Sequence, residues 1–487
     1  MRHYLAMDFG ASSGRGMLGC YDGKTLQLEE LHRFENGAVT GEDGHLYWDA
    51  ERLFGEIVKS LSLVAERGIQ LESVGVDTWG VDYGLLDSDG KLIGAPFNYR
   101  DSRTEGQMEA LFSEVPSDEV FAETGIQFMQ LNTLFQLYAE RDGDRLQKAD
   151  RLLFMPDLFN YLLTGVARCE RSIASTSQCY NPRKHDWAES LLQRVGLDSV
   201  PWAPLVDAGT VLGPVKAEIA SKTGIGPIPV VAVTGHDTAS AVVAVPARNQ
   251  DFCYLSSGTW SLMGAELDDP LIDARSHELN FTNEIGYGRT VRFLKNITGM
   301  WLQQECRRYW QEVGQDYSWK ELERMADGAE PFRSVINSDD PLFASPGNMP
   351  EKIADWCRAN GQPVPEEPGA YVRAIFEGLA LRYRWVVERL EELRGRPFEA
   401  LHVVGGGSAN ALLNRFTASA TGKMVLAGPT EATALGNIAV QMLGLGHVQR
   451  LEDARKLVAA SFPTVQYEPA NTQDWSAAAE RFKGLFG

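Results

Sequence analysis

The first segment with the residue types for chemistry lies near the N-terminus, at residues 8–15, and reads DFGASSGR. Small residues let the backbone approach an anion, and successive N–H groups with two serine hydroxyls can donate hydrogen bonds to it. Asp8, at the end of an expected strand, would orient a magnesium ion or its waters, and Arg15 adds a positive charge. The spacing matches neither a Walker loop nor a dinucleotide fingerprint. A tight hairpin without a ligand is an equal alternative.

A similar turn, SSGT, occurs at residues 256–259. Alone it indicates a plain turn, but two such turns in facing lobes would hold the two ends of a triphosphate. Residues 405–407 are three consecutive glycines directly after an expected buried strand, Leu401–Val404. Three glycines in a row are costly in chain entropy. We therefore favour a flat ligand such as an adenine-ribose unit lying on this backbone, over a glycine cluster that only packs a helix.

Residues 235–238, GHDT, lie between an expected buried strand, Pro229–Thr234, and a helix of small residues, Ala239–Val245. One interpretation is that Asp237 is a general base, because a hydroxyl that accepts a phosphoryl group needs a carboxylate to take its proton. The alternative is that Asp237 caps the helix. His236 either orients a substrate or is structural.

Three further segments carry polar or aromatic side chains. Residues 78–82, TWGVD, join two strands, and Trp79 is either a platform for a sugar ring or a core residue, while Gly80 permits close backbone contact. Residues 99–103, YRDSR, are either a salt-bridged surface or a substrate clamp. Asn296 and Gln304 flank an expected helix start, and as uncharged side chains they suit sugar or nucleotide recognition.

The elements that must position these residues are β-strands and helices in a mixed order. Apolar runs and turn residues predict strands at His3–Phe9, Arg15–Tyr21, Thr25–Phe34, Ser73–Thr78 and Val81–Leu86. Asp22-Gly23 predicts a hairpin turn. A helix capped by Asp49 and ending at Gly68 is predicted before the fourth strand. The order β-β-β-α-β excludes a dinucleotide fold, which alternates strands and helices from its start.

The opening pattern recurs in the second half of the chain. Ser12-Ser13-Gly14 is followed by Met17-Leu18-Gly19, and Ser256-Ser257-Gly258 by Leu262-Met263-Gly264, the second pair between strands expected at Phe252–Leu255 and Trp260–Ala265. A chance match is one explanation, because serine and glycine are common in turns. The position of each match near the start of a half favours an internal duplication. We expect two lobes, residues 1–245 and residues 246–487, and a long helix at Tyr371–Arg394.

Composition narrows the function classes. The 487 residues include 46 Lys and Arg against 66 Asp and Glu, a formal net charge of -20, which disfavours nucleic acid or an anionic membrane as a partner. The six cysteines form no C-x-x-C pair, and the eight histidines form no zinc pattern. The sequence shows neither a signal peptide nor a membrane span. We expect a soluble, cytoplasmic protein.

Taken together, these segments resemble the FGGY family of carbohydrate kinases. The motifs occur in family order and cover most of the chain: DFGASSGR, DTWGVD, YRDSR, GHDTASAV, YLSSGTWSLMG, LKN and VVGGG. Each motif is weak alone, whereas the ordered set is highly specific. The resemblance implies an α/β fold of two ribonuclease-H-like (actin/hexokinase-type) lobes, with ATP in the cleft between them.

The resemblance also implies roles for individual residues. The implied ATP-binding residues are Ala11, Ser12, Ser13, Gly14, Arg15, Thr259, Gln304 and Gly406. The implied substrate-binding residues are Gly80, His236, Asp237, Thr238 and Asn296, with Asp237 as the proton acceptor, and Asp8 would contact Mg²⁺ through water. After the triple glycine, residues 408–410 read SAN where relatives often carry Gln at the second place, so no adenine contact is transferred there. Ser172–Gln178 is only loosely similar and receives no role.

The function implied by the resemblance is transfer of a phosphoryl group from MgATP to the 1-hydroxyl of a ketose, L-rhamnulose, for which GHDTASAV and YLSSGTWSLMG are the indicative segments. Closure of the lobes would exclude water. One alternative is a kinase of the same family for L-fuculose or xylulose, since one hydrogen bond can separate such sugars. Another is a non-catalytic, actin-like nucleotide switch. The switch needs no base beside a sugar, so residues 236–238 with Gly80 favour a kinase.

Overall fold

The computed structural model describes residues 1–248 and 251–486. Their contacts divide the chain into two compact units. The first unit contains residues 1–248, Glu266–Phe293 and Ala432–Ser461, and the second contains residues 251–265, Leu294–Glu431 and 462–486. Two segments from the later part of the chain therefore pack with the first unit. How function is shared between residues 1–245 and 246–487 stays a prediction.

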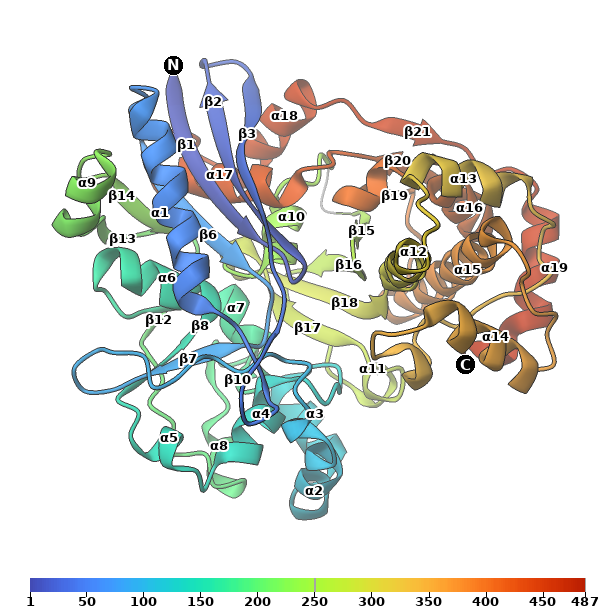
Figure 1. Cartoon of the computed structure of the whole chain (residues 1–487), viewed down its shortest axis with the longest axis horizontal. Helices are drawn as coiled ribbons and strands as arrows, with labels where there is room; N and C mark the ends of the chain where they lie inside the picture. Colours follow the sequence, from blue (N-terminus) through green and yellow to red (C-terminus); the bar gives the residue numbers. More distant parts are fainter. Residues whose placement is uncertain (249–250, 487) are drawn as a thin grey trace. The chain divides into compact units, whose positions relative to one another are not determined.

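A six-stranded sheet forms the centre of the first unit, in the order β13-β14-β6-β1-β2-β3 (Figure 1). Its strands are β1 (Arg2–Phe9), β2 (Ser13–Tyr21), β3 (Leu26–Glu35), β6 (Ser73–Thr78), β13 (Thr210–Pro214) and β14 (Pro229–Ala232). β1, β2 and β3 are antiparallel neighbours, β6 runs parallel to β1, and β14 runs parallel to β6. The predicted opening strands are confirmed, as is the hairpin turn, in which Gly23 has a φ of 97°.

Helices α1 and α17 pack on opposite faces of this sheet. α1 (Ala50–Glu66) begins where predicted, since the Asp49 side chain accepts a hydrogen bond from the Arg52 N–H. Val74 and Val76 of β6 share a core cluster with the apolar side chains of α1. Gly75 between them faces α17 (Ala432–Gly444), because a Cβ on Gly75 would lie 2.7 Å from Asn437 Oδ1. Successive residues of β6 therefore point alternately toward α1 and toward α17.

A third helix, α10 (Asp237–Val243), packs directly on α17. A Cβ added to Gly436 of α17 would lie 1.7 Å from the carbonyl oxygen of Ser240 in α10, so only glycine permits this backbone contact. This is the helix of small residues that the sequence predicts at Ala239–Val245. It begins two residues earlier than predicted and includes Asp237.

The remaining elements of the first unit are short. They are β4 (Val39–Thr40), β5 (Leu46–Tyr47), β7 (Tyr83–Leu86), α2 (Gln107–Glu114), α3 (Ser117–Thr124), α4 (Thr133–Glu140), α5 (Asp144–Gln147), β8 (Arg151–Phe154), α6 (Met155–Thr164), β9 (Cys169–Glu170), α7 (Arg171–Ser175), β10 (Tyr180–Asn181), β11 (Asp186–Trp187), α8 (Glu189–Arg194), β12 (Leu205–Val206), α9 (Ala217–Thr223), α11 (Ala274–Glu278), β17 (Thr282–Ile285) and α18 (Leu451–Ser461). Many of them follow β6 in the chain.

The second sheet repeats the strand order of the first. Its order is β17-β18-β16-β15-β19-β20-β21, with β15 (Cys253–Ser257), β16 (Trp260–Leu267), β18 (Val291–Thr298), β19 (Ala400–Val404), β20 (Met424–Ala427) and β21 (Val465–Tyr467). β15 pairs antiparallel with β16 and parallel with β19, β20 runs parallel to β19, and β21 closes the edge antiparallel. The first sheet has the same succession from β2 through β1, β6 and β14 to β13. This repetition is what an internal duplication predicts, and the expected two-lobed α/β fold is confirmed.

The second unit carries its helices around this sheet. They are α12 (Trp301–Glu312), α13 (Trp319–Gly328), α14 (Met349–Ala359), α15 (Pro368–Arg394), α16 (Ala411–Thr421) and α19 (Thr472–Phe482). α15 is the long helix that the sequence predicts, and it begins three residues earlier than expected. The side chain of Asn410 caps α16 by accepting a hydrogen bond from the Leu413 N–H.

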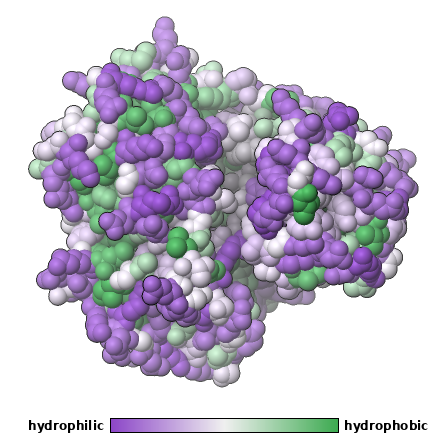
Figure 2. All heavy atoms as spheres, viewed as in Figure 1, coloured by the Kyte–Doolittle hydropathy of each residue, from purple (hydrophilic) through white to green (hydrophobic). Residues whose placement is uncertain are grey.

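The exposed face of each unit in Figure 2 is mainly hydrophilic, with apolar side chains scattered among polar ones. None of the helices in residues 1–248 and 251–486 is long and apolar enough to cross a membrane. All six cysteines are free thiols.

Candidate active site

The segment predicted to bind phosphate, residues 11–15, begins in the turn that joins β1 to β2 and continues into β2, which starts at Ser13, two residues earlier than predicted. The N–H of Gly10 donates to the Ser13 carbonyl at 2.9 Å, and Asn36 Nδ2 donates to the Gly10 carbonyl at 2.8 Å, so the turn is held from both sides. Gly14 is required for packing, because a Cβ there would lie 2.2 Å from the Phe34 ring. Ser12 is exposed, and Ala11, Ser13 and Arg15 are half-buried. The loop is therefore ordered and accessible to a ligand.

Three carboxylates gather beyond this turn. Asp8 on β1 and Asp77 on β6 are register partners, and Asp8 forms an ion pair with Arg15 at 2.6 Å. Burial, and next the charge of Asp8, raise the pKa of Asp77 well above its ordinary value. One oxygen of Asp77 accepts a hydrogen bond from Asn437 Nδ2 at 2.6 Å, and the other has no partner among the described residues. Sequence reasoning missed Asp77, although its position at the end of a fully buried strand was a usable signal.

Asp237 is the first residue of α10 and lies in the same region. Its Oδ1 accepts a hydrogen bond from the Thr238 N–H at 2.6 Å and faces the Thr238 hydroxyl at 3.2 Å. Burial raises the pKa of Asp237, the charge of His236 opposes the rise, and the charge of Asp8 adds to it. The side chain keeps 29% exposure. A carboxylate of raised pKa that still reaches solvent is suited to accept a proton from a substrate.

His236 and Gly80 are both predicted to contact the sugar. His236 directly precedes Asp237, and Gly80 follows the end of β6 by two residues. His236 Nε2 lies 3.4 Å from Asp237 Oδ1, and Thr78 and His236 form a parallel bridge between their backbones. A Cβ on Gly80 would lie 3.3 Å from Thr176, so a side chain there would be tight. Thr176 also accepts a hydrogen bond from the Val81 N–H at 3.1 Å. Ser172–Gln178, which received no role from sequence, thus supports this part of the site.

Trp79 is a core residue. It is 5% exposed, and its ring centroid lies 4.0 Å from that of Trp48. Both indole N–H groups donate to Asp82 Oδ2, at 2.6 Å from Trp48 and 3.0 Å from Trp79. The structure therefore favours the core alternative over a sugar platform, and Asp82 is the residue that holds the pair.

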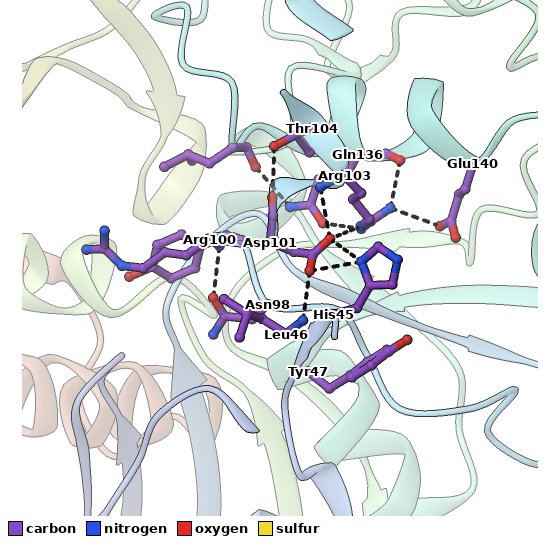
Figure 3. A network of polar contacts seen from close by, with 12 residues as sticks. His45, Leu46, Tyr47, Asn98, Arg100, Asp101, Arg103, Thr104, Gln136 and Glu140 are labelled. Carbon is purple, nitrogen blue, oxygen red and sulfur yellow. Dashed lines mark hydrogen bonds and ion pairs between the residues drawn. The ribbon is translucent and has the colours of Figure 1, made fainter. Parts of the chain in front are cut away.

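Asp101 and Arg103 belong to the polar network of Figure 3, together with His45, Leu46 and Gln136. Asp101 accepts hydrogen bonds from the N–H groups of Leu46 at 2.7 Å and Arg103 at 3.0 Å, and its carboxylate lies 3.0 Å from His45 Nδ1. Arg103 donates to Gln136 Oε1 at 2.7 Å. These contacts tie the loop to β5 and α4. Asp101 is only 2% exposed, so the pair holds the loop in place and does not form a salt-bridged surface. A role of this segment as a substrate clamp stays a prediction.

In the second unit, the structure brings together three segments that are predicted to bind ATP. Thr259 Oγ1 donates to Gln304 Oε1 at 3.1 Å, which joins the turn after β15 to the first turn of α12. Gly407 packs on the same turn, because a Cβ there would lie 2.0 Å from Ser257 Oγ. A Cβ on Gly406 would meet nothing within 4 Å. The two interpretations of the triple glycine thus apply to different residues: Gly407 serves packing, and Gly406 presents open backbone.

Asn296, the last predicted sugar contact, lies on β18. It is half-buried and stands five residues before α12 begins. Its neighbour Lys295 is buried, and burial lowers the pKa of that amine to about 7.

Known proteins resemble this chain over nearly its whole length. Residues 3–244 match the N-terminal domain of the FGGY family of carbohydrate kinases, and residues 253–445 match its C-terminal domain. A rhamnulokinase of Bacteroides thetaiotaomicron is 49% identical over 484 residues, covering 99% of each chain. A rhamnulokinase of Bacillus subtilis is 40% identical over 466 residues, covering 96% of this chain and 95% of its own.

Solved structures share the fold. A ligand-bound xylulose kinase from Lactobacillus acidophilus matches with a TM-score of 0.80 at 14% identity, covering 100% of this chain and 96% of its own. A glycerol kinase from Plasmodium falciparum with ADP matches with a TM-score of 0.79 at 15% identity, covering 99% and 98%. At such identities these structures establish the fold alone. With the domain matches and the relatives of higher identity, the chain belongs to the FGGY family of carbohydrate kinases.

Proposed function

We propose that the protein transfers the γ-phosphoryl group of ATP to the 1-hydroxyl of L-rhamnulose, and that the products are ADP and L-rhamnulose 1-phosphate in rhamnose breakdown. The observation that carries this proposal is the environment of Asp237, a carboxylate of raised pKa that keeps solvent access beside the phosphate-binding turn of its own unit. The identity of 40 to 49% to rhamnulokinases supports the choice of sugar.

In the proposed reaction, Asp237 accepts the proton of the attacking hydroxyl as the oxygen bonds to the γ-phosphorus and the bond to ADP breaks. A general base works best when its pKa lies near the working pH, and burial moves Asp237 in that direction. Thr238 holds one carboxylate oxygen through its backbone N–H and hydroxyl. The carboxylate is therefore oriented before the sugar arrives, which lowers the cost of reaching the transition state.

The nucleotide contacts we propose are residues 11–15 in the first unit, and Thr259, Gln304 and Gly406 in the second. Backbone N–H groups and serine hydroxyls of the turn would donate to phosphate oxygens. Arg15 is already paired with Asp8, so it adds directed hydrogen bonds more than net charge. Gly406 supports a ribose or purine contact, because its open side leaves room for a flat group.

Magnesium fits this site as a partner of ATP. Among the described residues, no group of three or more His, Cys, Asp or Glu side chains could hold a metal. Mg²⁺ keeps several waters and binds through one or two carboxylates together with substrate phosphates, so Asp8, through water, is the residue we propose for it. When bound, the ion would supply positive charge to the phosphate oxygens.

For the sugar, we propose Gly80, His236, Thr238 and Asn296 as contacts in addition to Asp237. Thr238 offers its hydroxyl oxygen beside the base, and the His236 ring would contact the sugar through its edge, because both ring nitrogens already face protein groups. Gly80 removes a side chain where Thr176 leaves little space. These polar groups would be left unpaired by a sugar that lacks the matching hydroxyl, which is how such a site selects among ketoses.

The test is a coupled assay of ADP release with L-rhamnulose, L-fuculose and D-xylulose, each at several concentrations. We expect the highest kcat/KM with L-rhamnulose and little ADP release without sugar. A higher kcat/KM for another ketose would refute L-rhamnulose as the preferred substrate but would still support a sugar kinase. ADP release that is indifferent to all three would refute the kinase and favour a nucleotide switch.

A further inference from the structure

Two buried charged side chains surround His236 from the side opposite Asp237. Glu284 lies on β17, and Arg292 on β18, and both belong to the first unit together with His236. Arg292 Nη2 donates to Glu284 Oε2 at 2.8 Å and lies 3.1 Å from His236 Nδ1, while Glu284 Oε2 lies 3.1 Å from the same nitrogen. The Arg292 side chain is 0% exposed and that of Glu284 5%. Neither residue stands in any motif of the sequence.

Stability does not account for this arrangement. A buried ion pair is often no better than apolar residues of similar size, because removing two charges from water offsets their attraction. Here Arg292 Nη1 is also buried without a hydrogen-bond partner among the described residues, which adds a further cost. A buried charged group that costs stability is a candidate for a functional role.

The pair offers Nδ1 of His236 a partner in either protonation state. Burial alone would raise the pKa of Glu284, but the charge of Arg292 and the contact with His236 outweigh it and lower that pKa to about 2. Glu284 is therefore an acceptor and Arg292 a donor at neutral pH. A bare Nδ1 accepts from Arg292, and a protonated Nδ1 donates to Glu284. The neutral ring with a bare Nδ1 carries its proton on Nε2, and the imidazolium carries one on each nitrogen, so in these two states the Nε2 proton is directed to Asp237 Oδ1, 3.4 Å away.

The position of the Nε2 proton determines which oxygen of Asp237 remains available to accept a proton from the substrate. Among the described residues, every polar contact of this carboxylate is to Oδ1: the Thr238 N–H, the Thr238 hydroxyl and His236 Nε2. Oδ1 is thus surrounded by donors, and Oδ2 is left to accept the proton of a substrate. On the opposite side, the backbone before Asp237 is fixed by Glu170 and Ser172, which accept from the N–H groups of Gly235 at 2.9 Å and His236 at 3.4 Å.

We propose that Glu284 and Arg292 are positioning residues of the phosphoryl transfer: they hold the ring and the Nε2 proton of His236 against Asp237 Oδ1, so that Oδ2 faces the sugar hydroxyl. The proposal rests on the proposed function for the role of Asp237. It assigns the pair no contact with ATP or with the reacting atoms.

The first test compares Glu284→Gln with wild type over pH. The variant keeps the size of the side chain but leaves the Arg292 charge unbalanced near Asp237. A net positive charge favours the carboxylate form, so the acid limb of kcat/KM moves to lower pH, by an amount on the order of one pH unit. kcat falls about 10-fold or more because the carboxylate is less well oriented, while KM for ATP stays within about 2-fold.

A matched control is available in the same unit. Arg455 and Glu266 form a buried pair at 2.7 Å, with both side chains 6% exposed. Glu266→Gln should cost similar stability and leave the acid limb in place. If both variants, or neither, move the limb, the positioning role is refuted. Wild type and variants are assayed with whichever of the three ketoses gives the highest kcat/KM, so the result does not depend on the identity of the sugar. If wild type phosphorylates none of the ketoses, the proposed function is refuted and the positioning role is not what failed.

The second test reads the His236 ring without turnover. Histidine-selective ¹⁵N labelling, with the signal assigned through His236→Gln, shows which nitrogen carries the proton. We expect it on Nε2 whenever the wild-type ring is neutral. In Arg292→Met, Nδ1 loses its donor while Glu284 still faces it at 3.1 Å, so the neutral ring should move toward the tautomer that carries its proton on Nδ1. A neutral wild-type ring protonated on Nδ1, or an unchanged tautomer in Arg292→Met, would overturn the proposal even if the variant is inactive.

Discussion

Gly406 and Gly407 are adjacent, yet the structure predicts opposite consequences for filling them. A Cβ on Gly406 would meet nothing within 4 Å, whereas a Cβ on Gly407 would lie 2.0 Å from Ser257 Oγ and 2.5 Å from Ser257 Cβ. Neither residue has a positive φ, so a side chain does not strain the backbone itself. Gly406→Val therefore probes the space that we assign to the nucleotide, and Gly407→Ala probes packing within the protein.

The magnitudes differ accordingly. A group of methyl size that is misplaced in a binding pocket changes binding by about 1–3 kcal/mol, so Gly406→Val should raise KM for ATP by about 10- to 100-fold. Its melting temperature should stay within about 2 °C of wild type, because nothing nearby is displaced. In Gly407→Ala, overpacking costs about 1–3 kcal/mol and the reduced freedom of the unfolded chain returns about 0.4–1 kcal/mol. At about 2–4 °C per kcal/mol, its melting temperature should fall by a few degrees.

The assay is steady-state kinetics with ATP and ketose varied in turn, together with thermal unfolding with and without ATP. Gly406→Val should lose most of the stabilisation that ATP confers on wild type, and its KM for the ketose should change little. Equal increases in both KM values would show that the triple glycine serves folding alone. A fall in melting temperature as large as that of Gly407→Ala would refute the open space at Gly406.

Three further substitutions test the first unit. Asp237→Asn should lower kcat by about 10²–10⁴ with little change in KM for the ketose, the usual share of a general base, and near-normal turnover would remove Asp237 from that role. Burial and the charge of Asp8 raise the pKa of Asp77, so the folded protein holds a proton that the unfolded chain releases. The free energy of unfolding of wild type should therefore fall as pH rises from about 4 toward the raised pKa. Asp77→Asn should remove this contribution to the pH dependence. Urea unfolding of both proteins at about pH 5 and about pH 8 measures this, and a constant difference between them would contradict it. Asp82→Asn turns an acceptor of four donors into a partial donor and should cost about 1–3 kcal/mol or more in urea unfolding, whereas Asp142→Asn, at a side chain 98% exposed, should cost almost nothing.

Local signals in the sequence predict much of the fold. The β-hairpin at Asp22-Gly23 and the helix capped by Asp49 depend on residues close together in the chain, and both are confirmed. The two Ser-Ser-Gly turns predict a duplication, and the repeated strand order agrees with it. These features need only local periodicity and turn chemistry.

The environment of Asp237 could not be predicted in the same way. Glu284 and Arg292 reach His236 from 48 and 56 residues away, Glu170 reaches Gly235 from 65 residues away, and no local pattern marks any of them. A buried ion pair looks in sequence like two ordinary charged residues, because only burial distinguishes them. Trp79 shows the same limit, because the sequence left a sugar platform and a core position open as alternatives. An exposed aromatic platform and a buried core tryptophan have the same sequence signature, and the decisive partner, Asp82, is identified only by its hydrogen bonds.

The contact between α10 and α17 has a consequence for how the protein is made. Helix α10 begins with Asp237, but its packing partner is about two hundred residues further along the chain, in the segment Ala432–Ser461 that completes the first unit. During translation at about 5–20 residues per second, the ribosome synthesises Leu294–Glu431 of the second unit before that partner exists. For at least about ten seconds, the nascent first unit therefore carries Asp237 on a helix whose side toward α17 is still uncovered.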